Sequence, residues 1–179
     1  MKVRAAVLAE DLANLVKARQ WSPGVIRKLE TLVKTGDDYD LFRINPLRFA
    51  ADRLVPEREA IDLMLHATRA GLFQMEWNLV CPTCGDMVES FRTLSRLNPH
   101  FHCSVCNLNS EASLDDYIHV TFTISPEVRE ISFHHPESLS ISDFHLRYHF
   151  NQSATLPDGA RFLDVVPSLV KGQAFLAPY

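Results

Sequence analysis

Four cysteines constrain this chain more than any other feature, because they form two Cys-x-x-Cys pairs with eighteen residues between the pairs. Each pair presents two sulfurs to one point, and two such pairs at the ends of a short β-excursion complete a tetrahedron. Gly85, directly after the first pair, suits a tight turn because glycine tolerates a left-handed backbone. The pattern therefore predicts a structural Zn²⁺ site of the zinc-ribbon type, with the ligands Cys81, Cys84, Cys103 and Cys106.

Disulfide or redox roles for these four cysteines have less support than a metal site. Disulfides suit a secreted protein, but residues 1–20 are amphipathic and do not read as a signal peptide. A redox Cys-x-x-Cys normally stands alone in a thioredoxin-like setting. His100 and His102 could each replace a ligand, but four cysteines already fill the shell, so we expect both at the surface or beside the ligands. Four thiolates leave no open coordination position, and we therefore expect a structural and not a catalytic metal.

The charge of the chain is spread unevenly. Residues 1–60 carry eleven Lys and Arg against nine Asp and Glu, a net of +2, whereas residues 61–179 carry seven against thirteen, a net of −6. At 179 residues the chain can bury a core as one domain or two. No apolar run approaches the length of a membrane span. Reduced, metal-bound cysteines favour a cytoplasmic location.

Apolar residues recur at helical spacing through residues 1–72 and predict a helical region there. The first helix is expected over residues 5–19, and the second to begin at Ser22-Pro23 and end at Gly36. Asn45-Pro46 and Pro56 are expected to open the third and fourth helices. The inward positions predicted for these last two helices are Leu47, Ala50, Ala51 and Leu54, then Ala60, Ile61, Met64, Leu65 and Ala67.

From Phe73 the apolar period changes to that of strands. We predict a β-region over 73–133 that carries the zinc ribbon (81–106), and a β-rich segment over 134–179 that belongs to the same sheet domain or stands beside it. The expected strands are 73–80, 87–91, 100–102, 117–124, 128–133, 144–150, 162–166 and 172–176. The fold class predicted is α+β, with an N-terminal helical bundle followed by an antiparallel β-region with the inserted four-cysteine ribbon.

No motif for an enzyme active site is present. The chain has no glycine-rich phosphate loop, no nucleophile elbow and no His-Glu-x-x-His, and its cysteines are committed to metal. On a strand, His145 and His149 would share a face with Asp143 nearby and could bind a metal, but exposed histidines on an edge strand are the commoner arrangement.

Binding of nucleic acid is disfavoured by charge. Arginines of the helical region could contact phosphates, but acidic neighbours and a net charge of only +2 favour ion-paired, solvated faces. The arginines in question are Arg43, Arg48, Arg53, Arg58 and Arg69. The ribbon is acidic, with two arginines against five carboxylates over residues 77–124, the wrong sign for phosphates.

Several runs resemble a known protein region. They are NPLRFA at Asn45–Ala50, EREAIDLMLHATRAGLF at Glu57–Phe73, WNLVCPTCG at Trp77–Gly85, LDD at Leu114–Asp116 and VTFTISP at Val120–Pro126. Across about residues 42–135 the chain resembles an uncharacterised N-terminal region of bacterial class III adenylate/guanylate cyclase-like proteins. The resemblance implies that cyclase chemistry lies in a separate, following domain, and it carries over only the four cysteines, as zinc ligands.

The sequence thus favours a zinc-stabilised regulatory or protein-interaction module associated with cyclic-nucleotide signalling, and not an enzyme. The alternatives are a structural adaptor subunit of an assembly and, less favoured, a nucleic-acid-binding regulator. The expected partner is another protein or a downstream domain. A homo-oligomer is compatible with this reading, and no membrane partner is expected.

Overall fold

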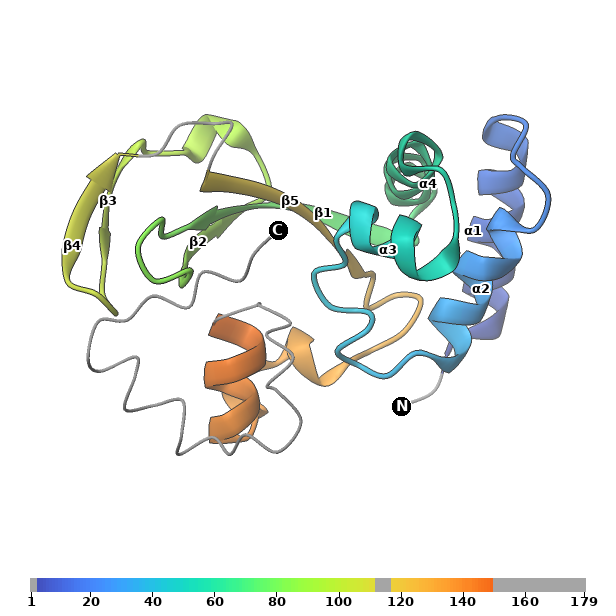
Figure 1. Cartoon of the computed structure of the whole chain (residues 1–179). Coiled ribbons are helices and arrows are strands. Elements are labelled where there is room, and N and C mark those ends of the chain that lie inside the picture. Colours follow the sequence, from blue (N-terminus) through green and yellow to red (C-terminus); the bar gives the residue numbers. More distant parts are fainter. Residues whose placement is uncertain (1–2, 112–116, 150–179) are drawn as a thin grey trace. The chain divides into compact units, whose positions relative to one another are not determined.

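The computed structural model describes residues 3–111 and 117–149 (Figure 1). The chain divides into two compact units. The first contains the described residues up to Glu76 together with Val120–Leu139, and the second contains the described residues of Trp77–His119 and those from Ser140 onward.

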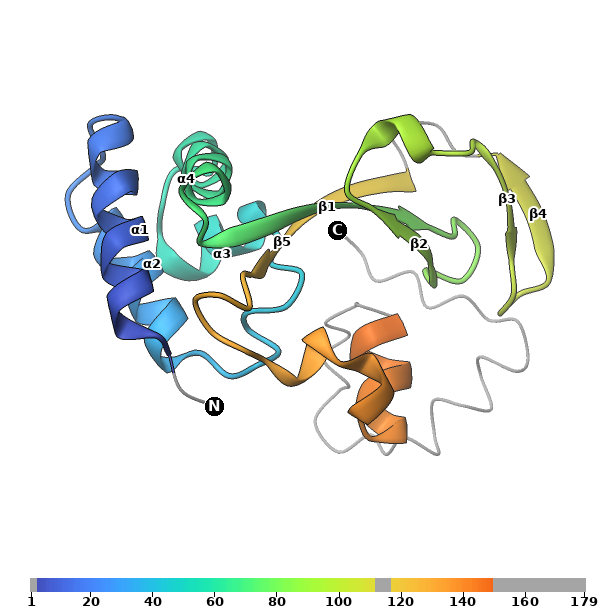
Figure 2. The ribbon, with the colours of Figure 1, turned by 180° about the vertical axis from the view of Figure 1, so that it is seen from behind.

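The first unit begins with four helices, as the apolar spacing predicts. These are α1 (Ala5–Ala18), α2 (Val25–Thr35), α3 (Pro46–Arg53) and α4 (Glu57–Ala70). Helix α4 packs against α1 and α3, and α1 lies beside α2 in both views (Figures 1 and 2). Leu8, Leu12 and Leu15 of α1 are buried at helical spacing, so they form the side of the core that the sequence indicates.

Helix α2 begins later than the sequence predicts. Ser22 and Pro23 lie in the turn ahead of it, and Gly24 precedes its first residue with a φ of 83°. This left-handed residue lies outside helical geometry, so the helix starts at Val25. Ser22 instead uses its backbone N–H to bond Glu59 Oε1 of α4 at 2.8 Å. The predicted end at Gly36 is confirmed.

The inward faces predicted for α3 and α4 are partly wrong. On α3 the buried residues are Pro46, Phe49 and Ala50. Leu47 is 47% exposed, and Ala51 and Leu54 also face solvent. On α4, Ile61 and Leu65 are exposed, while the buried set is Glu59, Ala60, Leu63, Met64 and Ala67. Each helix carries more apolar residues than its buried face can hold. The core packs on one edge of this wide apolar surface, so the buried face is rotated about the helix axis from the predicted one.

Gly71 ends α4 and turns the chain into the sheet. It has a φ of 100°, a conformation that favours glycine. The sheet has the order β2-β1-β5, from β1 (Phe73–Val80), β2 (Met87–Phe91) and β5 (Ile118–Ile124). Strands β1 and β2 are antiparallel, and Trp77 pairs with Phe91. The chain runs from one unit into the other within β1 and again within β5.

The second unit adds a two-stranded antiparallel sheet of β3 (His100–Cys103) and β4 (Leu108–Glu111). Strand β3 is predicted from the sequence, but β4 is not, because its residues Leu-Asn-Ser-Glu have neither the alternation nor the β-branched side chains of a typical strand. A short 3₁₀ turn, η1 (Leu94–Arg96), precedes β3.

The strand predicted over 128–133 is wrong. This stretch closes the first unit through side chains and short 3₁₀ turns, η2 (Ser132–His134) and η3 (Pro136–Ser138). The Arg129 guanidinium donates to Val33 O and Gly36 O, at 3.0 and 2.9 Å, and so caps the C-terminal end of α2. Phe133 stacks on Phe42 with ring centroids 4.6 Å apart.

The strand predicted over 144–150 is also wrong as far as the described residues reach. Asp143–His149 forms a π-helical segment, η4. Ser140 and Asp143 bond reciprocally at its start, and Arg147 pairs with Asp143 four residues earlier at 3.3 Å. Both contacts are helix-stabilising, which explains the outcome. The strands predicted over 162–166 and 172–176 lie outside the described residues.

Candidate metal centre

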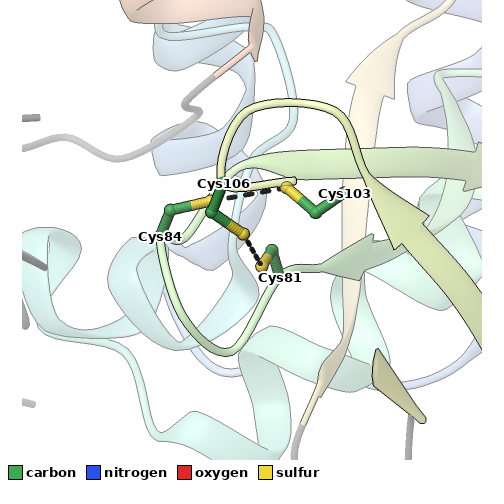
Figure 3. Close-up of side chains that lie close together, drawn as sticks. All are labelled: Cys81, Cys84, Cys103 and Cys106. Carbon is green, nitrogen blue, oxygen red and sulfur yellow. Dashed lines mark hydrogen bonds between the residues drawn. The ribbon is translucent and has the colours of Figure 1, made fainter. Parts of the chain in front are cut away.

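The four cysteines of the second unit lie together, as their spacing predicts (Figure 3). Their sulfur atoms are all within 4.8 Å of one another. Cys81 Sγ is 3.6 Å from Cys106 Sγ, and Cys84 Sγ is 3.5 Å from Cys103 Sγ, and none of the four forms a disulfide. A tetrahedral ion with metal–sulfur bonds of about 2.3 Å has sulfur–sulfur edges of about 3.8 Å. The cluster therefore has the dimensions of a tetrathiolate metal site.

Two similar turns deliver these sulfurs. In the first turn, which follows β1, Gly85 has a φ of 72° and its N–H donates to Cys81 O at 2.9 Å. In the second, which follows β3, Asn107 has a φ of 56° and its N–H donates to Cys103 O, also at 2.9 Å. Asparagine tolerates the left-handed region better than most residues, so Asn107 does in the second turn what glycine does in the first.

The role of Asn107 was not expected from the sequence. The signal that reveals it is its position, because each turn has the form Cys-x-x-Cys followed by a residue suited to positive φ. The first turn is further closed by the N–H of Cys81, which donates to Asp86 O at 2.8 Å.

Backbone N–H groups point at the sulfurs and affect their ionisation. Burial acts to raise the pKa of the Cys81 thiol, but hydrogen bonds from the N–H groups of Cys84 and Thr83 and from the thiols of Cys106 and Cys84 together outweigh burial, and the net pKa is lowered. Burial raises the pKa of Cys103 despite the N–H groups of Cys106 and Val105. In both turns the backbone N–H groups act to lower the thiol pKa, so they favour anionic sulfur.

The pKa of Cys84 is also raised, chiefly by burial and further by its neighbours Cys103 and Cys81. Four thiolates this close repel one another, so a bound cation is what allows them all to ionise. Cys81 and Cys103 are buried, and Cys84 and Cys106 are half-buried. The donor set fits a tetrahedral metal ion, and its shell is complete without water or substrate.

His100 and His102 do not enter this cluster. Successive side chains of a strand alternate between its faces, so both lie on the face of β3 opposite to Cys103. The burial of β3 agrees, because His100 and His102 are exposed, Phe101 is half-buried and Cys103 is buried. This agrees with the surface position expected for the two histidines.

Among the described residues, the tail histidines belong to no group of three or more potential metal ligands. Asp143 is engaged locally by Ser140 and Arg147. The side chain of His149 lies outside the described residues, and His145 lies on a helical segment and not on the predicted strand.

Within residues 3–111 and 117–149, no helix combines the length and apolar character needed to cross a bilayer. Fold and cluster together define an α+β protein whose β-region carries a four-cysteine cluster compatible with a metal site. The chain belongs to a family of unknown function, DUF5939, whose match covers residues 9–171. No curated protein and no solved structure matches the chain.

Proposed function

We propose that this chain is a zinc-stabilised regulatory or protein-interaction module, the non-catalytic region of an adenylate/guanylate cyclase-like protein. The observation that carries the proposal is the closed tetrathiolate cluster, in which four sulfurs lie within 4.8 Å of one another. Such a shell stabilises a fold but offers no coordination position to a substrate.

Zinc is the metal we infer for this centre. Tetrahedral sulfur sites take zinc or iron, and zinc imposes no geometric preference of its own. The residues that would hold it are Cys81, Cys84, Cys103 and Cys106. When bound, it would supply cross-linking energy to a unit whose strands β3 and β4 are only four residues long.

Elemental analysis of the untagged chain tests this inference. We expect one equivalent of tightly held zinc per chain and less than half an equivalent in C84S and C103S. S104A is the matched control, because Ser104 lies between the second pair of cysteines without belonging to the cluster, and it should retain the metal. A preparation that folds with no stoichiometric transition metal would refute the zinc assignment.

The regulatory role rests on the resemblance of residues 42–135 to the region ahead of class III cyclase domains. A cyclase domain encoded in the same or a neighbouring reading frame is the partner to test. We expect the wild-type chain to bind that domain and to change its rate of cyclic-nucleotide formation, and C84S to lose the effect. No binding and no change in rate, with zinc bound, would contradict the regulatory role and favour a structural adaptor in another assembly.

The alternative of a nucleic-acid-binding regulator has less support from the helical unit. Arg43 is buried, with its guanidinium 4.6 Å from the centroid of the Phe42 ring, and Arg48 pairs with Asp52 at 3.5 Å. Two of the five arginines considered for phosphate contact are thus occupied within the protein. Retention on duplex DNA that falls steeply with added salt would revive this alternative.

A further inference from the structure

One face of the β3–β4 hairpin gathers polar side chains that the cysteine centre does not use. His100 pairs with Glu111, and His102 pairs with Asn109. Residues paired across an antiparallel ladder point to the same face, and so do residues two apart on one strand. Two imidazoles, a carboxylate and an amide therefore share one face, and all four side chains are exposed. Residues 100–102 and 109–111 line a shallow hollow open to solvent.

His102 is prepared to act as a ligand. Its Nδ1 lies 3.0 Å from Asn109 Oδ1. Because an amide oxygen only accepts, Nδ1 carries the hydrogen of this bond, and the lone pair of the neutral ring is on Nε2. Metal-binding histidines are commonly held in this way, with one ring nitrogen donating to a neighbouring oxygen while the other binds the ion.

His100 and Glu111 lie beside His102 on the same face of the hairpin. The Cα atoms of residues two apart on a strand are separated by about 6.8 Å. Two imidazoles at this separation can bind the same ion with metal–nitrogen bonds of about 2.0 Å. Glu111 lies directly across from His100, at a cross-strand separation of about 5 Å between Cβ atoms. The exposed side chains of His100 and Glu111 can rotate toward His102 Nε2 at little cost.

We propose that His100, His102 and Glu111 form a second, exchangeable site for a divalent transition-metal ion, on the face of the hairpin opposite to Cys103. Two imidazoles and a carboxylate select ions such as Zn²⁺, Ni²⁺ and Cu²⁺ over Mg²⁺ and Ca²⁺. With at most three protein ligands, the ion keeps at least one position for water or an outside ligand. Asn109 is a positioning residue that sets the tautomer of His102. The site does not depend on the regulatory role proposed above.

Calorimetric titration of the zinc-loaded chain with Ni²⁺ tests the proposal. We expect one saturable equivalent of Ni²⁺ while the protein retains its zinc. H100Q, H102Q and E111Q should each weaken Ni²⁺ binding about tenfold or more, in line with the loss of one ligand or its support. The matched controls H135Q and H145Q remove exposed histidines elsewhere and should leave the affinity unchanged.

Asn109 is tested by a pair of variants. N109L should weaken Ni²⁺ binding about tenfold, because the Nδ1–H of His102 loses its acceptor. N109D should preserve binding, because a carboxylate oxygen accepts the same hydrogen bond. A purely structural role for Asn109 would make both variants change the stability without this difference in affinity.

The wild-type chain provides a measurement that needs no variant. In an NMR titration, substoichiometric paramagnetic Ni²⁺ should broaden the ring signals of His100 and His102 before those of the other histidines. Absence of a saturable Ni²⁺ equivalent, or broadening that begins at any other histidine, would overturn the proposal.

Discussion

Gly85 and Asn107 occupy equivalent positions, each directly after the second cysteine of its pair. Both have a positive φ, and each donates its N–H to the carbonyl of the first cysteine of that pair. This relationship makes the two turns a matched pair built from different residues. A left-handed backbone costs an L-residue with a Cβ about 1–2 kcal/mol, with asparagine among the least affected. Adding a Cβ at Gly85 should therefore weaken zinc binding, whereas removing the side chain of Asn107 should not.

We predict that G85A weakens zinc binding about fivefold. The added Cβ strains the left-handed backbone by about 1 kcal/mol, and because zinc binding and folding of the turn are coupled, this strain makes the free energy of zinc binding less favourable. N107G should bind zinc as tightly as the wild type or slightly more tightly. Competition with a chromophoric zinc chelator measures both affinities. If N107G weakens binding while G85A does not, the equivalence of the two turns is wrong.

Removal of the metal should act on one unit and spare the other. The buried apolar residues of α1, α2 and α4 form the core of the first unit, to which no cysteine belongs. A strong chelator, or the variant C84S, should therefore collapse the dispersion of amide NMR signals from residues 77–111, while the helical signal in circular dichroism is retained. S104A should match the wild type before chelation.

The opposite result would also be informative. Cooperative loss of the helical signal on chelation would mean that the helices depend on the metal for their stability. The division into two compact units would then not describe how the protein unfolds.

The parts of the fold that the sequence predicted well are those in which one local rule decides the outcome. Cysteine spacing predicts a shared sulfur site, because two short turns leave few other geometries. The change from helical to alternating spacing at Phe73 coincides with the start of β1, and Asn45-Pro46 marks the start of α3. The predicted strands 73–80 and 87–91 agree with β1 and β2.

The predictions fail where packing against neighbouring elements decides which residues are buried or which segments form strands. Ile61 is as apolar as Leu63, but only Leu63 faces the packed side of α4, and periodicity cannot choose between adjacent apolar positions. Glu59 is buried because it accepts the N–H of Ser22, thirty-seven residues away in the sequence. Strand β4 exists because β3 lies beside it, and its own residues carry little signal.

Asn45 gives a local test of helix capping. Its Oδ1 accepts the N–H of Leu47 at 2.8 Å and of Arg48 at 3.4 Å, at a helix that begins with Pro46. We predict that N45A lowers the free energy of unfolding by about 1 kcal/mol, whereas N45D, which retains an accepting oxygen, leaves it within about 0.5 kcal/mol. Urea denaturation followed by circular dichroism measures both. Equal losses in the two variants would show that the cap contributes nothing specific.

Asp38 should make the stability of the first unit depend on acid pH. Its carboxylate accepts the Ser132 N–H at 2.9 Å and lies 3.3 Å from Nη2 of the buried Arg129. Burial acts to raise the pKa of Asp38, but the hydrogen bonds from Ser132 and the charge of Arg129 together outweigh it, so the net pKa is lowered. A lowered folded-state pKa means that the unfolded chain takes up the proton first. The stabilisation is therefore complete above the unfolded value of about 3.9 and is lost as the pH falls through the folded pKa.

We predict that D38N lowers the free energy of unfolding by about 2 kcal/mol at neutral pH, because a charged acceptor beside a buried guanidinium is lost. The gap between wild type and D38N should shrink as the pH falls below about 3.9. The substitution W77F leaves Trp21 of the first unit as the only tryptophan. The fluorescence of Trp21 then reports unfolding of the first unit alone, even where acid releases the metal from the second unit. D52N is the control, because the Arg48–Asp52 pair is exposed and should contribute less than about 0.5 kcal/mol at either pH. A gap that stays constant down to pH values well below the unfolded pKa would contradict a role for the Asp38 charge.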